Sequence, residues 1–132
     1  MAYPNATINE GDFGTFWVDA AGAVTLYQRV KFSTTAAADN KPTLVVAGVT
    51  DRGNAIVMAP AAASTPTVVR FLNAQGEQFG QASGTIGIGV AVYTAALGVY
   101  SATQGSGLLA GISTTAGYDG GPFTFLPIVA AA

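Results

Sequence analysis

Short runs of β-branched and aromatic residues, separated by turn-forming residues, limit what this chain can fold into more than any other feature. Runs of this kind predict strands when glycine, asparagine or aspartate bounds them. They recur along almost the whole sequence, in the ranges 13–18, 24–32, 43–49, 54–59, 67–72, 86–94, 99–103, 107–114 and 122–129. We therefore expect an all-β protein with about seven or more strands and with helix far below the usual share of about a third.

Helix signals are scarce by comparison. The alanine-rich segments Thr34–Asp39 and Ala59–Ala63 are the candidates, and both are too short to be stable as isolated helices. Thr85–Leu97 is apolar, but its glycines predict strand-turn-strand rather than a helix that spans a membrane. The first residues have neither the basic start nor the apolar stretch of an export signal, so we expect no export and no membrane contact.

The sequence also contains a partial internal repeat. The matching segments are, in chain order, Val30–Ser33 with Val92–Thr94, Leu44–Thr50 with Leu108–Ser113, and Val68–Leu72 with Phe123–Ile128. The middle pair shares an Ala-Gly step, and glycine suits a strand that another backbone approaches closely. Two interpretations stay open: a fold built from two repeated halves, or a coincidence in a chain rich in alanine and glycine.

Cysteine and histidine are both absent from the 132 residues. The chain therefore lacks disulfides, the usual general base and the commonest zinc ligands. Its seven acidic residues stand apart, mostly in turns, where aspartate bonds the backbone. We expect no enzymatic activity, no metal and no cofactor. A pair of carboxylates that meets only in space, as in a glycosidase, is the remaining catalytic alternative.

Charged residues make up only 9% of the chain, and the net charge is -2. An ordinary soluble domain has about 25% charged residues. Nothing here provides the basic surface that nucleic acid would require. Gly84–Gly89 is glycine-rich but does not match the dinucleotide-binding fingerprint. A surface with so few charges is poorly protected against association, so we expect much of it to contact protein. The alternative is a surface that is weakly charged but contacts only solvent.

Three aromatic residues lie close together near the start of the chain, at Phe13, Phe16 and Trp17. Neighbouring residues of a strand point to opposite faces of its sheet. We expect Phe13 and Phe16 to pack inward and Trp17 to be an exposed interface anchor, because tryptophan is enriched at binding hot spots. Residues 1–12 are expected to form an N-terminal arm, and residues 13–132 a single β domain.

Three strand motifs follow one another in the second part of the chain, at Gly89–Thr94, Gly98–Thr103 and Leu108–Ile112. The opening Asn5–Asp12 ends in Glu-Gly-Asp. Together these segments resemble the small capsid decoration proteins of tailed bacteriophages, which are also called cement or head-stabilising proteins. The chain departs from that pattern at Ala59–Pro66, which looks like an insertion, and at Asn73–Gly80, which is polar and glutamine-rich.

The resemblance implies a small antiparallel β-barrel or β-sandwich of the β-tulip type with an extended N-terminal arm. It also implies a protein that binds the outer surface of the mature capsid as a trimer and stabilises it. Its partners would be the major capsid protein and further copies of itself, in the virion after assembly in the host cytoplasm. The arm would bind the capsid by strand pairing, through the residues Tyr3, Pro4, Asn5, Ala6, Thr7, Ile8 and Asn9.

Two other classes of function remain open. A carbohydrate- or surface-binding β-module of a fibre or adhesin would need a cluster of exposed aromatic residues, whereas the five tyrosines are dispersed. A small hydrolase is disfavoured by the missing histidine and cysteine.

Overall fold

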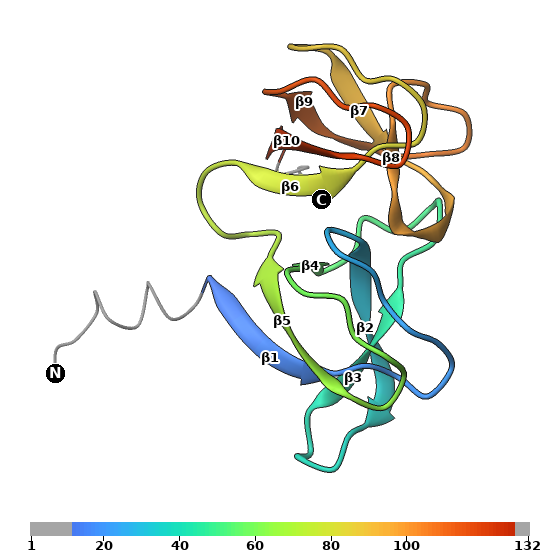
Figure 1. Ribbon diagram of the computed structural model, residues 1–132, viewed down its shortest axis with the longest axis vertical. Coiled ribbons are helices and arrows are strands. Elements are labelled where there is room, and N and C mark those ends of the chain that lie inside the picture. Colours follow the sequence, from blue (N-terminus) through green and yellow to red (C-terminus); the bar gives the residue numbers. More distant parts are fainter. Residues whose placement is uncertain (1–11, 129–132) are drawn as a thin grey trace, which may run out of the picture.

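The computed structural model describes residues 12–128, which form ten strands and one 3-10 turn (Figure 1). In chain order these are β1 (Phe13–Trp17), β2 (Arg29–Ala36), β3 (Pro42–Val46), β4 (Ala55–Val57), β5 (Pro66–Phe71), β6 (Gln78–Gln81), β7 (Ala91–Thr94), η1 (Ala96–Gly98), β8 (Tyr100–Ser101), β9 (Leu109–Ser113) and β10 (Pro122–Pro127). The prediction of an all-β fold is confirmed.

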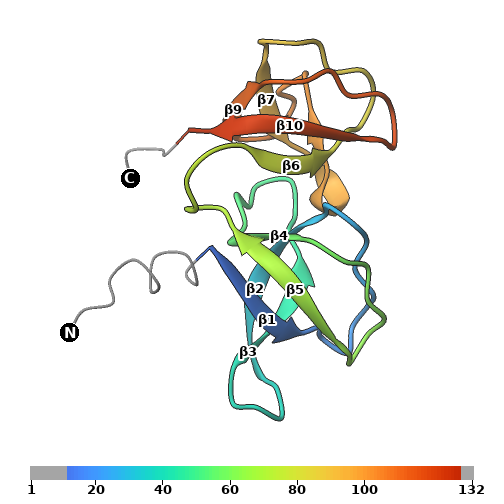
Figure 2. The ribbon, with the colours of Figure 1, turned by 60° about the vertical axis from the view of Figure 1, so that its left-hand side comes forward.

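The strands form two antiparallel five-stranded sheets with the same strand order. The first is β1-β5-β4-β2-β3 and the second is β6-β10-β9-β7-β8, so that β1 matches β6, β2 matches β7, and so on. We call β1–β5 the first half and β6–β10 the second half. The two halves are stacked along the long axis of the molecule, and the chain passes between them after β5 (Figure 2).

The register between strands repeats as well. Ile56 of β4 pairs with Arg70 of β5, and at the matching place Ile112 of β9 pairs with Leu126 of β10. The isolated bridge between Val24 and Ala61 likewise matches that between Ile86 and Gly117. The same backbone pattern is therefore built twice from largely different side chains, which confirms the prediction of two repeated halves.

The edges of each sheet approach each other without forming a continuous ladder. A single parallel bridge joins Val18, just after β1, to Leu44 of β3, and its counterpart joins Ala82 to Tyr100. Apart from these bridges, no ladder connects the edge strands of either sheet in the described part of the chain. The two sheets fit the sandwich-like form of the prediction, and closure into a barrel is not found.

The predicted repeat matches the wrong strands in its middle segment. Leu44 lies in β3, whereas Gly111 lies in β9, whose counterpart is β4. The shared Ala-Gly step is therefore a coincidence of composition. Glycine is needed for a close approach at Gly111, where a Cβ would overlap the carbonyl of Leu126. At Gly48 the nearest atom to such a Cβ is 3.7 Å away.

Two predicted strands begin later than expected. The runs 24–32 and 86–94 become strands only at Arg29 and Ala91. The backbone turns just before each strand, where Tyr27 and Gly89 have φ values of 63° and 73°. A left-handed residue cannot continue a strand, so both runs are interrupted at matching places.

The two helix candidates are not helical. Thr34–Ala36 continues β2, and Ala59–Ala63 forms a loop that contains one β-bridge. Strand β6 was not predicted, because its glutamines and glycine give no strand signal. Gln78 is nevertheless fully buried, and it donates from Nε2 to the carbonyl of Phe71 at 3.3 Å.

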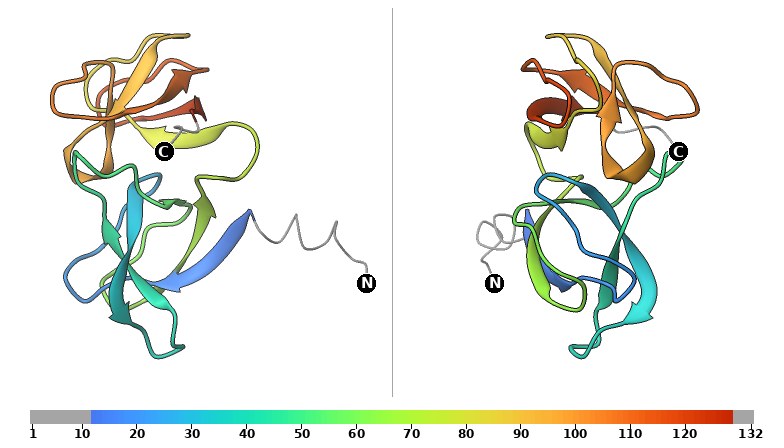
Figure 3. Two further views of the ribbon diagram at one scale, coloured as in Figure 1. Left: turned by 180° about the vertical axis from the view of Figure 1, so that it is seen from behind. Right: turned by 45° about the vertical axis from the view of Figure 1, so that its right-hand side comes forward.

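Each half encloses its own apolar cluster. The buried residues of the first are Val18, Val24, Val30, Leu44, Ala55, Val57 and Val69. Those of the second are Ile56, Ala82, Ile86, Val92, Tyr100, Phe123 and Phe125. Ile56 belongs to the first half by sequence but packs in the core of the second. The two halves, one above the other in Figure 3, thus share a buried boundary, which we call the seam.

Candidate functional site

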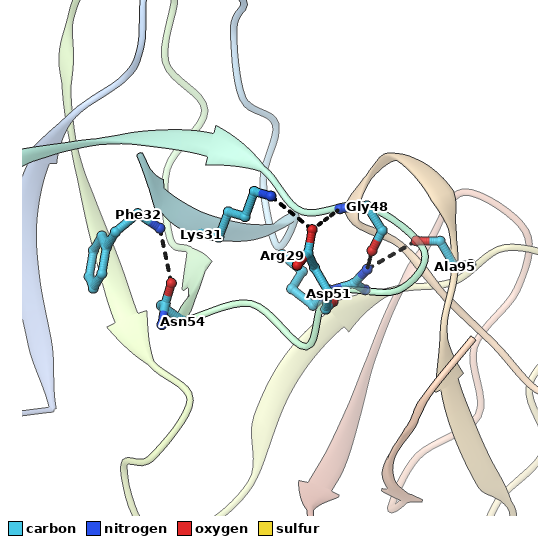
Figure 4. A network of polar contacts seen from close by, with 7 residues as sticks. All are labelled: Arg29, Lys31, Phe32, Gly48, Asp51, Asn54 and Ala95. Atoms are coloured by element: carbon cyan, nitrogen blue, oxygen red, sulfur yellow. Dashed lines mark hydrogen bonds and ion pairs between the residues drawn. The ribbon is translucent and has the colours of Figure 1, made fainter. Parts of the chain in front are cut away.

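Arg29 on β2 joins the two halves across the seam and is fully buried. Its guanidinium donates to four backbone carbonyls. Those of Asp51 and Gly48, at 2.9 and 2.7 Å, belong to the first half. Those of Val99 and Ala95, at 2.7 and 3.0 Å, belong to the second, and Figure 4 shows the contacts with Gly48 and Ala95. Burial lowers the pKa of Arg29, and the carbonyl oxygens compensate for its lost hydration.

The ring of Tyr100 supports the same guanidinium. Its centroid lies 4.9 Å from Cζ of Arg29, and burial raises the pKa of Tyr100 to about 12. The 3-10 turn η1 packs on β2 here, where Gln28 donates from Nε2 to the carbonyl of Leu97 at 2.8 Å. Because the guanidinium is sealed off from solvent, this arrangement is a structural contact and offers nothing to a substrate.

The acidic residues perform turn and surface roles. Asp19 accepts from the hydroxyl of Thr43 at 2.7 Å and from the backbone N–H of Ala21 at 2.9 Å, and these bonds lower its pKa. Nζ of Lys31 lies 2.9 Å from Oδ2 of Asp51, and this contact holds the pKa of the Asp51 carboxyl below its usual value. In the range 12–128, no three histidine, cysteine, aspartate or glutamate side chains gather in a way that could hold a metal ion.

The aromatic residues of β1 divide between its two faces in a way that differs in part from expectation. Phe16 points inward, and its ring centroid lies 4.9 Å from that of Phe32. Phe13 and Trp17 share the opposite face, and Phe13 is 48% exposed. The prediction that Phe13 packs inward is therefore wrong. Trp17 is only partly exposed, and its role as an interface anchor stays a prediction.

The outer face of β1 and β5 is largely apolar. Register places Thr15 opposite Val68 and Trp17 opposite Pro66, so these side chains lie on one face with Phe13. Val68 is 42% exposed. We call these five residues the β1–β5 face. Next to it, Trp17 also lines a pocket of about 300 Å³ that includes Asp19, Thr35, Thr43 and Ser64.

A second exposed apolar face lies on the second sheet. Ile112 is 40% exposed, and its cross-strand partner Leu126 is 48% exposed. Ile128, just beyond β10, is 40% exposed, and its backbone N–H donates to the carbonyl of Ala110 on β9. We call Ile112, Leu126 and Ile128 the β9–β10 face. Contiguous exposed apolar residues on a soluble protein commonly mark a surface that binds another molecule.

The β9–β10 face has only a weak signal in the sequence. The residues of Phe123–Leu126 alternate only in part, and an antiparallel strand with one solvated face ordinarily carries polar residues at its outward positions. The signal for this face is leucine and isoleucine at outward positions of the strand, with almost no charged residue nearby in the sequence.

The seven arm residues predicted to bind a capsid, Tyr3 to Asn9, lie outside the described residues. No protein-family model matches this sequence, and no curated protein matches it significantly. Between residues 12 and 128, no helix is long and apolar enough to cross a membrane.

Proposed function

We propose that this chain is a non-catalytic capsid decoration protein of a tailed bacteriophage. It binds the outer surface of the mature capsid as a trimer and stabilises the lattice, and it is located in the virion after assembly in the host cytoplasm. The observation that carries the proposal is the pair of exposed apolar faces on a chain with only 9% charged residues. Such surfaces are costly in water and are stabilised when protein covers them. The motifs shared with decoration proteins point to the same function.

In this proposal the apolar faces and the N-terminal arm have separate roles. The faces hold copies of the chain together, and residues Tyr3 to Asn9 pair with an exposed strand edge of the major capsid protein. Several arms on one trimer bind neighbouring capsid subunits at once, so contacts that are individually weak become lasting. Trp17 adds an aromatic contact beside the pocket.

The charged groups of the described residues support a role without catalysis. Arg29 is sealed in the seam, Asp51 pairs with Lys31, and Asp19 accepts from the backbone of its own turn and from a hydroxyl on β3. These groups already hold partners that stabilise the fold.

Co-sedimentation with capsids tests the proposal. Purified protein is mixed with mature capsids that lack their decoration, with immature capsids, and with no capsid. We expect binding that saturates on mature capsids and raises the temperature at which they release DNA. Absence of binding to the mature capsids of the phage that encodes the chain would overturn the proposal.

The pocket beside Trp17 favours a second candidate function, a carbohydrate-binding module. A tryptophan next to the hydroxyls of Thr35 and Ser64 offers a stacking surface together with polar groups that could bind a sugar. Trp17 is the only tryptophan of the chain, so its fluorescence reports on this pocket directly. A saturable change on titration with oligosaccharides, absent in Thr35→Val, would support this candidate.

A further inference from the structure

The seam is an interface between two unlike surfaces. The first half contributes the β2 and β4 part of the outward face of its sheet, where Arg29 and Ile56 are paired and fully buried. The second half contributes Phe79 of β6, which stacks on Tyr27 with ring centroids 4.5 Å apart, and the buried Tyr100. Each half therefore uses a different surface to bind the other.

The second half has its own copy of the face that the first half buries. Register matches Arg29 and Ile56 with Ala91 and Ile112, which are paired across β7 and β9. Leu126 and Ile128 occupy the places that Arg70 and Leu72 occupy in the first half. This copy is the β9–β10 face, and it is uncharged and exposed.

The first half likewise has its own copy of the surface that the second half uses. Phe79 pairs with Thr124 across β6 and β10, just as Thr15 pairs with Val68 across β1 and β5. Thr15 therefore corresponds to Phe79. It lies at the centre of the β1–β5 face, between Phe13 and Trp17. Both surfaces that the seam leaves unused are thus exposed and largely apolar, with Arg70 beside Phe13 at the border of the β1–β5 face.

We propose that the β9–β10 face of one copy binds the β1–β5 face of a second copy, so that the seam within the chain is repeated between chains. The occupant of each apolar face is then the opposite face of another copy. Such a contact joins unlike surfaces, and it closes into a ring if its rotation allows and otherwise extends as a filament. This inference specifies how the copies associate in the trimer of the proposed function, but it does not depend on what that trimer binds.

Charge substitutions test whether two unlike faces are involved. Leu126→Lys alters only the β9–β10 face, and Val68→Lys alters only the β1–β5 face. We expect the unmodified chain to form oligomers and each variant alone to sediment as a monomer. An equimolar mixture of the two should form a dimer and nothing larger, because one intact face of each kind remains. If either variant alone still dimerises, the contact joins two like faces and the inference is wrong. Circular dichroism verifies that both variants keep the β fold.

Cysteine cross-linking gives an independent readout, because the chain has no cysteine of its own. Val68→Cys protein mixed with Leu126→Cys protein should form a disulfide-linked dimer on mild oxidation. Each variant alone should form far less of it. Tyr118→Cys, at a position 70% exposed on a turn, replaces either partner as the control for random collision. Equal cross-linking in all mixtures would overturn the inference.

These measurements are made without capsids, so the two proposals can fail separately. A chain that remains monomeric at every concentration and gives no specific cross-link, yet decorates capsids, contradicts the inference and leaves the proposed function standing. A chain that forms the predicted contact but binds no capsid supports the inference and contradicts the proposed function.

Discussion

Tyr27 and Gly89 occupy the same place in the two halves, although one has a large aromatic side chain and the other has none. Their φ values are 63° and 73°. The backbone N–H of Tyr27 donates to Val57 at 2.8 Å, and that of Gly89 donates to Ser113 at 2.9 Å. A left-handed conformation is unfavourable for tyrosine by about 1–3 kcal/mol. The ring of Tyr27 stacks on Phe79 in the buried seam, and this contact offsets the strain. The backbone therefore follows the same path in both halves, although one has tyrosine and the other glycine at this place.

Gly98 should be one of the least replaceable residues of the seam. Its φ is 71°, and a Cβ there would lie 2.6 Å from the carbonyl oxygen of Arg29. Gly89 has a similar φ of 73° but open space around it. We expect Gly89→Ala to lower the free energy of unfolding by about 1 kcal/mol, through backbone strain alone. Gly98→Ala should lower the free energy of unfolding by about 1–3 kcal/mol more than that, because the added Cβ pushes the two halves apart at the seam. If urea denaturation gives the same loss in free energy of unfolding for both variants, the seam accommodates the added methyl group without cost.

Replacing Arg29 should weaken the contact between the halves strongly. Arg29→Met keeps much of the side-chain volume but removes the guanidinium from four carbonyls, of which those of Gly48 and Val99 still accept a backbone N–H. Hydrogen bonds to a charged group contribute about 1.5–3 kcal/mol each, so we expect a loss of roughly 3 kcal/mol or more. Arg52→Met is the control, since Arg52 makes one long, exposed bond of 3.4 Å to Leu109. A loss for Arg29→Met no larger than that of the control would contradict this account.

Stability should fall at alkaline pH because of Tyr100. Burial raises its pKa to about 12, whereas the unfolded chain has the ordinary value of 10.0. The folded state therefore holds the proton more tightly. The resulting stabilisation is complete below pH 10 and is lost as the pH rises from 10 towards 12, by an amount on the order of 2–3 kcal/mol. Tyr100→Phe keeps the ring over Arg29 and should flatten this part of the pH profile. An unchanged slope in that variant would mean that another group titrates there.

Deleting residues 2–9 should separate capsid binding from folding. We expect the melting temperature to stay nearly unchanged and capsid binding to be strongly weakened. Ordering about five arm residues on the capsid costs roughly 5–10 kcal/mol of backbone entropy, which strand pairing and burial of Tyr3 and Ile8 must exceed. Full decoration by the truncated chain would place the binding surface in the β domain instead. Unfolding of the truncated chain would show that the segment belongs to the core.

The fold class could be predicted because strand signals are local. Each run between Phe13 and Pro127 carries its own β-branched and aromatic residues and its own turn. Pairing is not local, and for that reason the repeat was aligned on the wrong middle strand. Gly48 and Gly111 look alike in sequence, but one lies in a turn and the other beneath a neighbouring backbone.

The faces of β1 could have been assigned more fully from the sequence. Phe13 and Trp17 are separated by an even number of positions, so a strand must place them on one face and Phe16 on the other. The seam role of Arg29 had no such signal. A single arginine in a strand resembles a solvated residue, and its carbonyl partners come from turns far away in the sequence.

Every strand pairing and every isolated bridge lies within one half. During synthesis on the ribosome, the first half can therefore complete its ladders once β5 has emerged, while the second half is still being made. Until the second half has folded, Ile56 and Leu72 lack the core that will cover them, and the nascent chain exposes an apolar surface. Strand β6 follows β5 after only a short connection, but its ladder partner is β10, the last of the ten strands to be made. The covering sheet is therefore complete only when β10 has emerged, and a molecule halted before that point keeps an apolar surface through which it could aggregate.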